Sequence, residues 1–310
     1  YPWLPVNEET QGKLPGQFIV IYGRPKSIKS FVAIYMACHD YLSSRRRVMF
    51  YTREMHPMLV AQRMAACIAG VDYKAFKNGQ LQPELKAQTF NILQELMEDE
   101  KNAGETGTVQ PALKIVSDRG AGGSGGGVSW LRSKIKEFKP HIVYVDGMYL
   151  MRDDRTNQRT VDWKAIAHIS QDLKLTAQEF EVPLIGVTQA NRGSQKSAGE
   201  DLTELAFSDS LGQDADAVFR VSKKERIDDH KIKQSEIWIT APGLREGKFE
   251  GIVVGGNPCT DFSFKRLLTG MEKDDDAAQQ SNQKQRSNQP SVSPNYKNSF
   301  VQDIRPPLKK

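Results

Sequence analysis

The chain has 310 residues, of which 38% are hydrophobic, and a formal net charge of +5. This length is enough for one large or two ordinary domains with a buried core, and so mild a charge permits a polyanionic partner without indicating one. The sequence has no apolar run long enough to cross a bilayer, and its first residues lack the basic and apolar parts of a signal peptide, so we expect neither a membrane-spanning nor an exported protein.

The three cysteines, Cys38, Cys67 and Cys259, are far apart and show no C-x-x-C spacing. The sequence therefore predicts neither a disulfide framework nor a zinc site, and a reducing compartment suits such thiols. We expect a cytoplasmic protein that is not bound to a membrane.

The first element is an apolar run, Phe18 to Tyr22, which breaks into a glycine, a basic loop and a Lys-Ser pair. This pattern is typical of a phosphate-binding loop, in which backbone N–H groups surround the phosphates, Lys29 neutralises them and the Ser30 hydroxyl binds Mg²⁺. A helix that begins near Lys29 adds the positive end of its dipole. The residues expected to bind nucleotide are Gly23, Arg24, Pro25, Lys26, Ser27, Ile28, Lys29 and Ser30.

One position of this loop departs from the usual pattern. Ile28 stands where a glycine normally precedes the lysine, and a β-branched residue enters a positive φ only at a cost. From the loop alone, a plain strand, turn and helix with a chance Lys-Ser pair stays open as an alternative.

Further along the chain, short β-branched runs alternate with longer segments of helical periodicity, which predicts an α/β fold with a mostly parallel sheet covered by helices on both faces. The expected strands are Phe18–Tyr22, Val48–Thr52, Leu113–Val116, His141–Val145, Leu184–Thr188 and Ala217–Val221. The expected helices are Ser30–Leu42, Leu59–Ala69, Glu84–Glu100, Val128–Phe138 and Val161–Phe180. Ligands of such a sheet gather at the carboxyl ends of its strands.

The composition changes near Glu272, after which the chain consists of Asp, Gln, Asn, Ser, Lys and Pro with scattered single apolar residues. Such a segment cannot bury enough surface to offset its ordering entropy, so we expect a disordered tether. The predicted organisation is an N-terminal linker over residues 1–16, an α/β domain over 17–270 and a disordered tail over 271–310.

Polar residues follow three of the predicted strands after the first. Asp146 ends its strand, where it can hold Mg²⁺ through water; Glu54 can polarise an attacking water; and the Gln189 amide can contact a γ-phosphate and report its loss. Each of these residues alone is equally compatible with an ordinary loop position. Together with the loop at Gly23, they predict a nucleoside triphosphate site with Mg²⁺ at one edge of the sheet.

A second glycine-rich run gives an alternative, because Gly120–Gly125 formally matches G-x-G-x-x-G and Asp146 follows about twenty residues later, as in dinucleotide-binding proteins. The run is so rich in glycine that many registers match, and it lies well after the first strand and helix. We interpret it as a loop.

The motifs and their spacing resemble the hexameric replicative helicases of the DnaB type, which have a RecA-like P-loop motor domain. The match covers nearly the whole predicted domain. Its most specific part is the Gln-Asp-Ala-Asp signature. The matching segments are Val6–Gly12, Gly23–Ser30, Tyr51–Met55 with Gln62–Met64, Val143–Asp146 with Tyr149–Met151, Val182–Arg192, and Ser208–Asp216 with Gln213-Asp214-Ala215-Asp216.

The resemblance implies an ATP-dependent DNA helicase in which six subunits form a ring and nucleotide binds between neighbours. Glu54 is then the catalytic base, and Lys29 and Gln189 contact the phosphates. Arg245 best matches the arginine that reaches the γ-phosphate of the next subunit, a role suited to a planar guanidinium. The family usually has a lysine two residues before this arginine, where Gly243 stands here, so Lys248 is the available substitute.

In this family single-stranded DNA passes through the central pore and is held by the loops that follow Asp146 and Gln189. Both loops are basic here, with Arg152, Arg155 and Arg159 in the first and Arg192 and Lys196 in the second. These residues suit contacts to phosphates that do not depend on base sequence, although for any one of them a solvated loop charge is the alternative.

Bacterial members carry a helical N-terminal collar that docks primase, whereas this chain begins almost directly at the motor. We therefore expect a fragment or a compact viral type, from a bacterium or a virus-infected cell, with primase or a helicase loader as further partners. Two other functions stay open: a recombination or regulatory ATPase of the RecA type that does not unwind DNA, and a ring-forming scaffold with weak hydrolysis.

Overall fold

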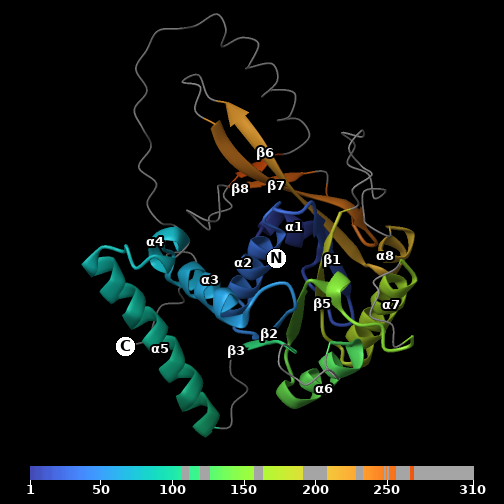
Figure 1. Cartoon of the computed structure of the whole chain (residues 1–310), viewed down its shortest axis with the longest axis horizontal. Helices are drawn as coiled ribbons and strands as arrows, with labels where there is room; N and C mark the ends of the chain where they lie inside the picture. Colours follow the sequence, from blue (N-terminus) through green and yellow to red (C-terminus); the bar gives the residue numbers. More distant parts are fainter. Residues whose placement is uncertain are drawn as a thin grey trace, which may run out of the picture.

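The computed structural model describes residues 1–106, 112–118, 126–156, 163–190, 208–227, 233–247, 249, 251–255 and 266–268. A nine-stranded sheet in the order β3-β2-β4-β5-β1-β6-β7-β8-β9 forms its centre (Figure 1). The strands are β1 (Phe18–Gly23), β2 (Arg47–Thr52), β3 (Ala112–Val116), β4 (Ile142–Asp146), β5 (Leu184–Gln189), β6 (Ala217–Ile227), β7 (Lys233–Leu244), β8 (Ile252–Gly255) and β9 (Arg266–Leu268).

The α/β prediction is confirmed, and each predicted strand and helix has a counterpart whose ends differ by at most a few residues, except that β6 and the helix after residue 82 run further. Three short helices were not expected: α1, α4 and α8. The helices are α1 (Leu4–Thr10), α2 (Lys29–Leu42), α3 (Pro57–Ala69), α4 (Tyr73–Lys77), α5 (Pro83–Thr106), α6 (Val128–Phe138), the 3₁₀ turn η1 (Met148–Leu150), α7 (Trp163–Glu179) and α8 (Ser208–Asp214). Within the described ranges, none of the helices has the length and apolar character needed to span a membrane.

The sheet is a central layer with a hydrophobic core on each face. Ile19 and Ile21 of β1 contribute to the core under α1, α2 and α3, whereas Phe18, Val20 and Tyr22 face α6, α7 and α8. Figure 1 shows these two groups of helices on opposite sides of the strands. Because β1 is buried on both faces, its sequence is continuously apolar rather than alternating, which is why it could be recognised from the sequence.

Beyond β6 the sheet becomes antiparallel. β6 pairs parallel with β1 but antiparallel with β7, and the β6–β7 ribbon extends past the other strands (Figure 1). The pairing shifts between Val218 and Arg220, close to Pro242 on β7, as expected where a residue without an N–H interrupts a ladder. We did not predict β7, β8 and β9: β7 mixes charged, polar and apolar residues, and the apolar runs of β8 and β9 are at most four and three residues long.

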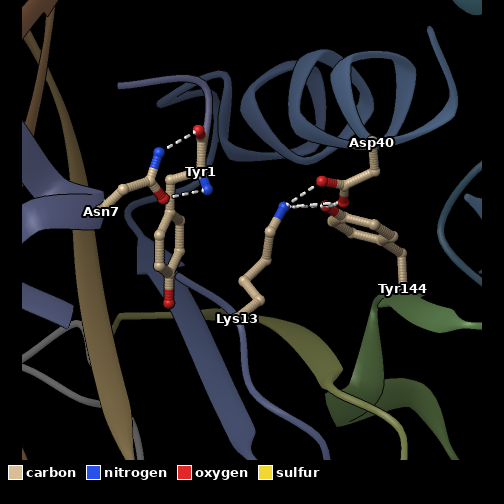
Figure 2. A network of polar contacts seen from close by, with 5 residues as sticks. All are labelled: Tyr1, Asn7, Lys13, Asp40 and Tyr144. Carbon is tan, nitrogen blue, oxygen red and sulfur yellow. Dashed lines mark hydrogen bonds and ion pairs between the residues drawn. The ribbon is translucent and has the colours of Figure 1, made fainter. Parts of the chain in front are cut away.

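A buried ionic network ties the N-terminal segment to the domain at the amino edge of the sheet (Figure 2). Lys13 Nζ donates to both carboxylate oxygens of Asp40 on α2, at 2.5 and 2.7 Å, and lies 3.2 Å from the hydroxyl of Tyr144 on β4. That hydroxyl donates to Asp40 Oδ2 at 2.5 Å. Tyr1 lies beside the network and is held by Asn7 through its amino group and its carbonyl. Burial lowers the pKa of Lys13, and the adjacent Asp40 carboxylate opposes that shift.

The substitution Asp40→Ala should destabilise the protein by about 3–5 kcal/mol, because it leaves the Lys13 ammonium and the Tyr144 hydroxyl buried without their shared acceptor. Urea unfolding at neutral pH measures this loss. Glu137→Ala is the matched control, since it removes a carboxylate whose ion pairs with Lys114 and Lys134 are exposed. An Asp40→Ala protein as stable as the control would show that the N-terminal segment is held by its apolar contacts alone.

Candidate active site

The predicted phosphate loop and the polar residues Glu54, Asp146 and Gln189 meet at the carboxyl edge of four adjacent strands. Gly23 ends β1 opposite Gln189 of β5, and Thr52 of β2 lies opposite Asp146 of β4. Glu54 follows Thr52 by two residues. The structure thus brings the loop after β1 and the three predicted polar residues to a single edge of the sheet.

The loop between β1 and α2 is a compact turn. Ser27 N donates to Arg24 O at 3.0 Å, and α2 begins directly at Lys29. The glycine at position 23 is required by its surroundings, since a Cβ there would lie 2.4 Å from both Ser27 Oγ and the carbonyl oxygen of Val221. Within the described residues, the buried Ser27 Oγ has no hydrogen-bond partner. The loop is therefore a tight turn that runs directly into the N-terminus of α2, which is the positive end of the helix dipole.

Ile28, the departure from the glycine pattern, occupies the left-handed region with φ 69° and ψ 15°. The loop thus keeps the backbone conformation that glycine would adopt freely, at a cost of about 1–3 kcal/mol for a non-glycine residue. The partly buried Ile28 side chain packs against the core under α2, which offsets part of that strain. α2 begins at the next residue, Lys29, so Ile28 does not interrupt the path from the loop into the helix.

Lys29, Ser30 and Asp146 form the polar centre of the site. Ser30 Oγ donates to Asp146 Oδ1 at 2.9 Å, and the Lys29 side chain lies buried beside them. Asp146 is fully buried and, among the residues that the structure describes, its Oδ2 has no hydrogen-bond partner. Burial, reinforced by the charge of Glu54, raises the pKa of Asp146 to about 6.

This donor set fits Mg²⁺ bound together with a nucleotide. The ion prefers oxygen ligands and commonly takes only one or two from the protein, with phosphates and water completing its shell. The Ser30 hydroxyl and the Asp146 carboxylate supply oxygens, and the partnerless Oδ2 is the kind of buried acceptor that a cation satisfies. The described part of the chain shows no cluster of three or more His, Cys, Asp or Glu side chains suited to a metal held by the protein alone.

Glu54 is held against the turn that follows β4. Arg53 N donates to Asp146 O at 3.0 Å, which extends the pairing of β2 and β4 past the strand ends. Gly147 has a φ of 85°, and a Cβ there would lie 3.2 Å from Glu54 N, so only glycine lets the two segments approach so closely. Gln189 Nε2 donates to the hydroxyl of Tyr149 at 2.5 Å. The contact of Tyr149 could not be predicted, because nothing in the sequence shows that its hydroxyl reaches the end of β5.

Arg245 is not part of this cluster. It follows Leu244, which pairs with Ala217 at the start of β6, and therefore lies at the amino edge of the sheet. Its guanidinium bonds Asp216 Oδ1 at 3.0 Å and Gln213 O at 2.8 Å. The six residues of β1 separate the two edges by about 17–20 Å, more than an arginine side chain spans. Arg245 cannot contact a nucleotide bound at its own chain's loop.

Residues 4–255 of the chain match the family of the DnaB-like helicase C terminal domain. The chain belongs to this DnaB-like family. The replicative DNA helicase DnaB of Haemophilus influenzae is 25% identical over 233 residues, covering 73% of this chain and 46% of that protein. A probable plasmid replicative DNA helicase of Chlamydia trachomatis serovar L2 is 27% identical over 221 residues, covering 68% of this chain and 44% of that protein. The DnaB-like chain thus spans just under half the length of these curated relatives.

Solved structures agree on the fold. One of them, an ATPase domain, superposes with a TM-score of 0.66 at 20% identity, covering 86% of this chain and 88% of that one. A DnaB-like replicative helicase, solved to show its interactions with primase, superposes with a TM-score of 0.65 at 20% identity, covering 81% of this chain and 57% of that one. The mostly parallel sheet of the DnaB-like chain is therefore a RecA-like fold.

The basic residues expected to contact DNA are only partly described in this DnaB-like domain. Arg152 follows η1, and its backbone N donates to Gly126 O at 2.9 Å. Arg155 is about half exposed and pairs with Asp172 of α7 at 2.5 Å. Its loop is fixed by the buried Asp153, which accepts bonds from Arg155 N and Thr156 Oγ1. Arg159, Arg192, Lys196, Lys248 and the glycine-rich run Gly120–Gly125 lie outside the described residues.

Proposed function

We propose that this chain is the ATP-hydrolysing motor of a ring-shaped replicative DNA helicase, which moves along single-stranded DNA and opens the duplex ahead of it. Membership of the DnaB-like family supports the class of protein. The observation that carries the proposal is the Ser30–Asp146 pair beside the buried Lys29, at the end of a loop that opens into a helix. Relatives of this chain are named replicative DNA helicases.

In the proposed reaction, Lys29 and the loop N–H groups hold the phosphates of ATP, while Ser30 and Asp146 hold Mg²⁺. When bound, Mg²⁺ neutralises charge on the phosphate oxygens. Glu54 orients a water and accepts its proton as the oxygen attacks the γ-phosphorus in line with the departing ADP oxygen. Gln189 contacts the γ-phosphate and carries its loss to the segment that follows β5.

Arg245 lies at the opposite edge of the sheet from its own chain's loop, which supports a homo-oligomer, and the resemblance to ring-shaped helicases implies that this oligomer is a hexamer. Arg245 would act on nucleotide bound by the neighbouring subunit, where its planar guanidinium stabilises the charge of the transferring phosphoryl group. Single-stranded DNA would run past Arg152, Arg155, Arg192 and Lys196.

The motor is proposed to span residues 17–270, preceded by a linker over 1–16 whose Tyr1, Trp3 and Val6 pack in the core of the motor. The proposed tether, residues 271–310, lies outside the described residues. A helicase loader and primase are the expected partners, the latter because a structural neighbour was solved with regard to its interactions with primase. The cytoplasm of a bacterium or of a virus-infected cell is the compartment that this role implies.

Steady-state ATP hydrolysis with and without single-stranded DNA tests the proposal. We expect DNA to stimulate turnover by the parent, and Lys29→Ala to fall to background because the phosphates lose their buried cation. The parent should also displace a strand from a forked duplex. DNA-stimulated hydrolysis without displacement would favour a recombination or regulatory ATPase instead, and nucleotide binding without any hydrolysis would favour a scaffold.

A further inference from the structure

One phenol hydroxyl lies between two of the polar residues at the carboxyl edge of the sheet. The Tyr149 hydroxyl accepts a hydrogen bond from Gln189 Nε2 at 2.5 Å. Its other polar neighbour is the side chain of Glu54, whose backbone N and Cβ lie against Gly147 in the same turn and whose charge acts on the phenol. Because a phenol has a single proton, that proton points to the carboxylate while an oxygen lone pair receives the amide N–H. The chain of donors therefore runs in one direction, from Gln189 through Tyr149 to Glu54.

The position of this tyrosine is fixed by its surroundings. η1 starts from Gly147 in the left-handed conformation and closes with bonds from Leu150 N to Gly147 O at 2.9 Å and from Met151 N to Met148 O at 3.0 Å. Met148 and Met151 are buried in the core under α6 and α7. The tyrosine between them is anchored by backbone and packing, so its hydroxyl is a fixed point between two side chains from different strands.

Both neighbours act on the titration of the Tyr149 phenol. Burial, then the negative charge of Glu54, raises the pKa of Tyr149 to about 12, and the bond from Gln189 opposes that rise. These directions are those of a neutral phenol that donates to a carboxylate and accepts from an amide.

We propose that Tyr149 is a positioning residue, which joins the Gln189 amide to the Glu54 carboxylate so that a displacement at the end of β5 changes the orientation of the catalytic base. This inference rests on the proposed function of Glu54 and Gln189. β5 continues directly into the segment proposed to contact DNA, and Ala190 N is bonded to Gly23 O at 3.0 Å, so the strand end lies against the phosphate loop as well. A movement of DNA bound by the segment after β5 would therefore act on the Glu54 carboxylate through the Tyr149 hydroxyl.

The first test is the Tyr149→Phe substitution, which keeps the ring and its packing and removes only the hydroxyl. Loss of a hydrogen bond to a charged group predicts that DNA-stimulated kcat falls about ten- to hundredfold, with the KM for ATP unchanged within about twofold. Because both residues act through one chain, the Tyr149→Phe/Gln189→Ala double variant should turn over no more slowly than the slower single variant.

Tyr51→Phe is the matched control. Tyr51 on β2 donates to Asp118 Oδ1 at 3.2 Å, so this substitution removes a similar tyrosine–carboxylate bond that does not involve Glu54 or Gln189. Its DNA-stimulated kcat should stay within about twofold of the parent. Multiplicative effects of the two substitutions in the double variant, or equal losses from Tyr149→Phe and Tyr51→Phe, would overturn the proposal.

A second test does not need turnover, which separates this inference from the proposed function. With 3-fluorotyrosine at position 149, the phenol titration can be followed by ¹⁹F NMR. The pKa of the phenol should fall in Glu54→Gln and rise in Gln189→Ala, since one change removes the raising carboxylate and the other the lowering donor. If neither substitution moves the titration, the chain of hydrogen bonds is absent, whether or not the protein hydrolyses ATP.

Discussion

Arg245→Ala is expected to reduce DNA-stimulated ATP turnover by about 10³-fold or more, the magnitude associated with an arginine supplied to a phosphoryl-transfer site by a neighbouring subunit. The reason lies in the topology: β7 returns antiparallel to β6 and delivers Arg245 to the amino edge of the sheet. Nucleotide binding by each subunit should persist, because the phosphate loop is untouched. Arg245→Lys should also fail, since an ammonium cannot replace the planar fork.

Mixing variants checks the direction of this contact. In a 1:1 mixture of Arg245→Ala and Lys29→Ala subunits, some interfaces combine an intact loop from the first with an intact arginine from the second. Turnover should therefore reappear. Arg132→Ala, which removes a partly exposed arginine of α6 that pairs with Glu179 of α7 and contacts neither Asp216 nor Gln213, should leave turnover unchanged. A mixture as inactive as its components would contradict a role in trans.

Asp146→Asn should have two opposite effects, abolishing ATP hydrolysis while stabilising the nucleotide-free protein. The pKa of Asp146 is raised from 3.8 to about 6, so the folded chain binds this proton more tightly than the unfolded chain does. Stability therefore falls as the pH rises from about 4 to about 6 and is then constant. Above that window the ionised carboxylate costs about 2–3 kcal/mol, which the isosteric amide avoids.

Urea unfolding of the parent and Asp146→Asn at pH 8 and at pH 4, without nucleotide, measures this difference. The variant should be more stable at pH 8, and the gap should close at pH 4. Glu137→Gln is a control of opposite sign, because hydrogen bonds from Lys134 and Lys114 lower the pKa of the exposed Glu137. A variant no more stable than the parent at pH 8 would show that Asp146 is not held at a cost in the absence of its ligands.

The elements that could be predicted from the sequence are those whose burial leaves a simple pattern. β1 and β4 are buried on both faces and read as continuous apolar runs, and the parallel arrangement then brought Asp146 and Gln189 to the same edge. The sequence alone could not show whether Ile28 disrupts the loop, because strain at φ 69° competes with packing that only the fold reveals.

Residues whose roles depend on contacts between distant segments were missed. Tyr149 meets Gln189 from 40 positions away, and Lys13 meets Tyr144 from 131 away. No local pattern records such pairs. β7 was not predicted for a different reason. It has a neighbouring strand on each side, but its sequence has little of the continuous apolar character that marks the central strands.

Asp216, whose carboxylate pairs with Arg245, has further partners besides this arginine. Asp216 also accepts a bond from Phe18 N at 2.8 Å and an ion pair from Lys174. If Arg245 turns toward a neighbouring subunit, Asp216 keeps both of these and is not left as a buried, uncompensated charge, which would cost several kcal/mol. Arg245 can therefore leave Asp216 at little cost in free energy. If subunits associate through this arginine, their association and dissociation need not disturb the fold around Asp216.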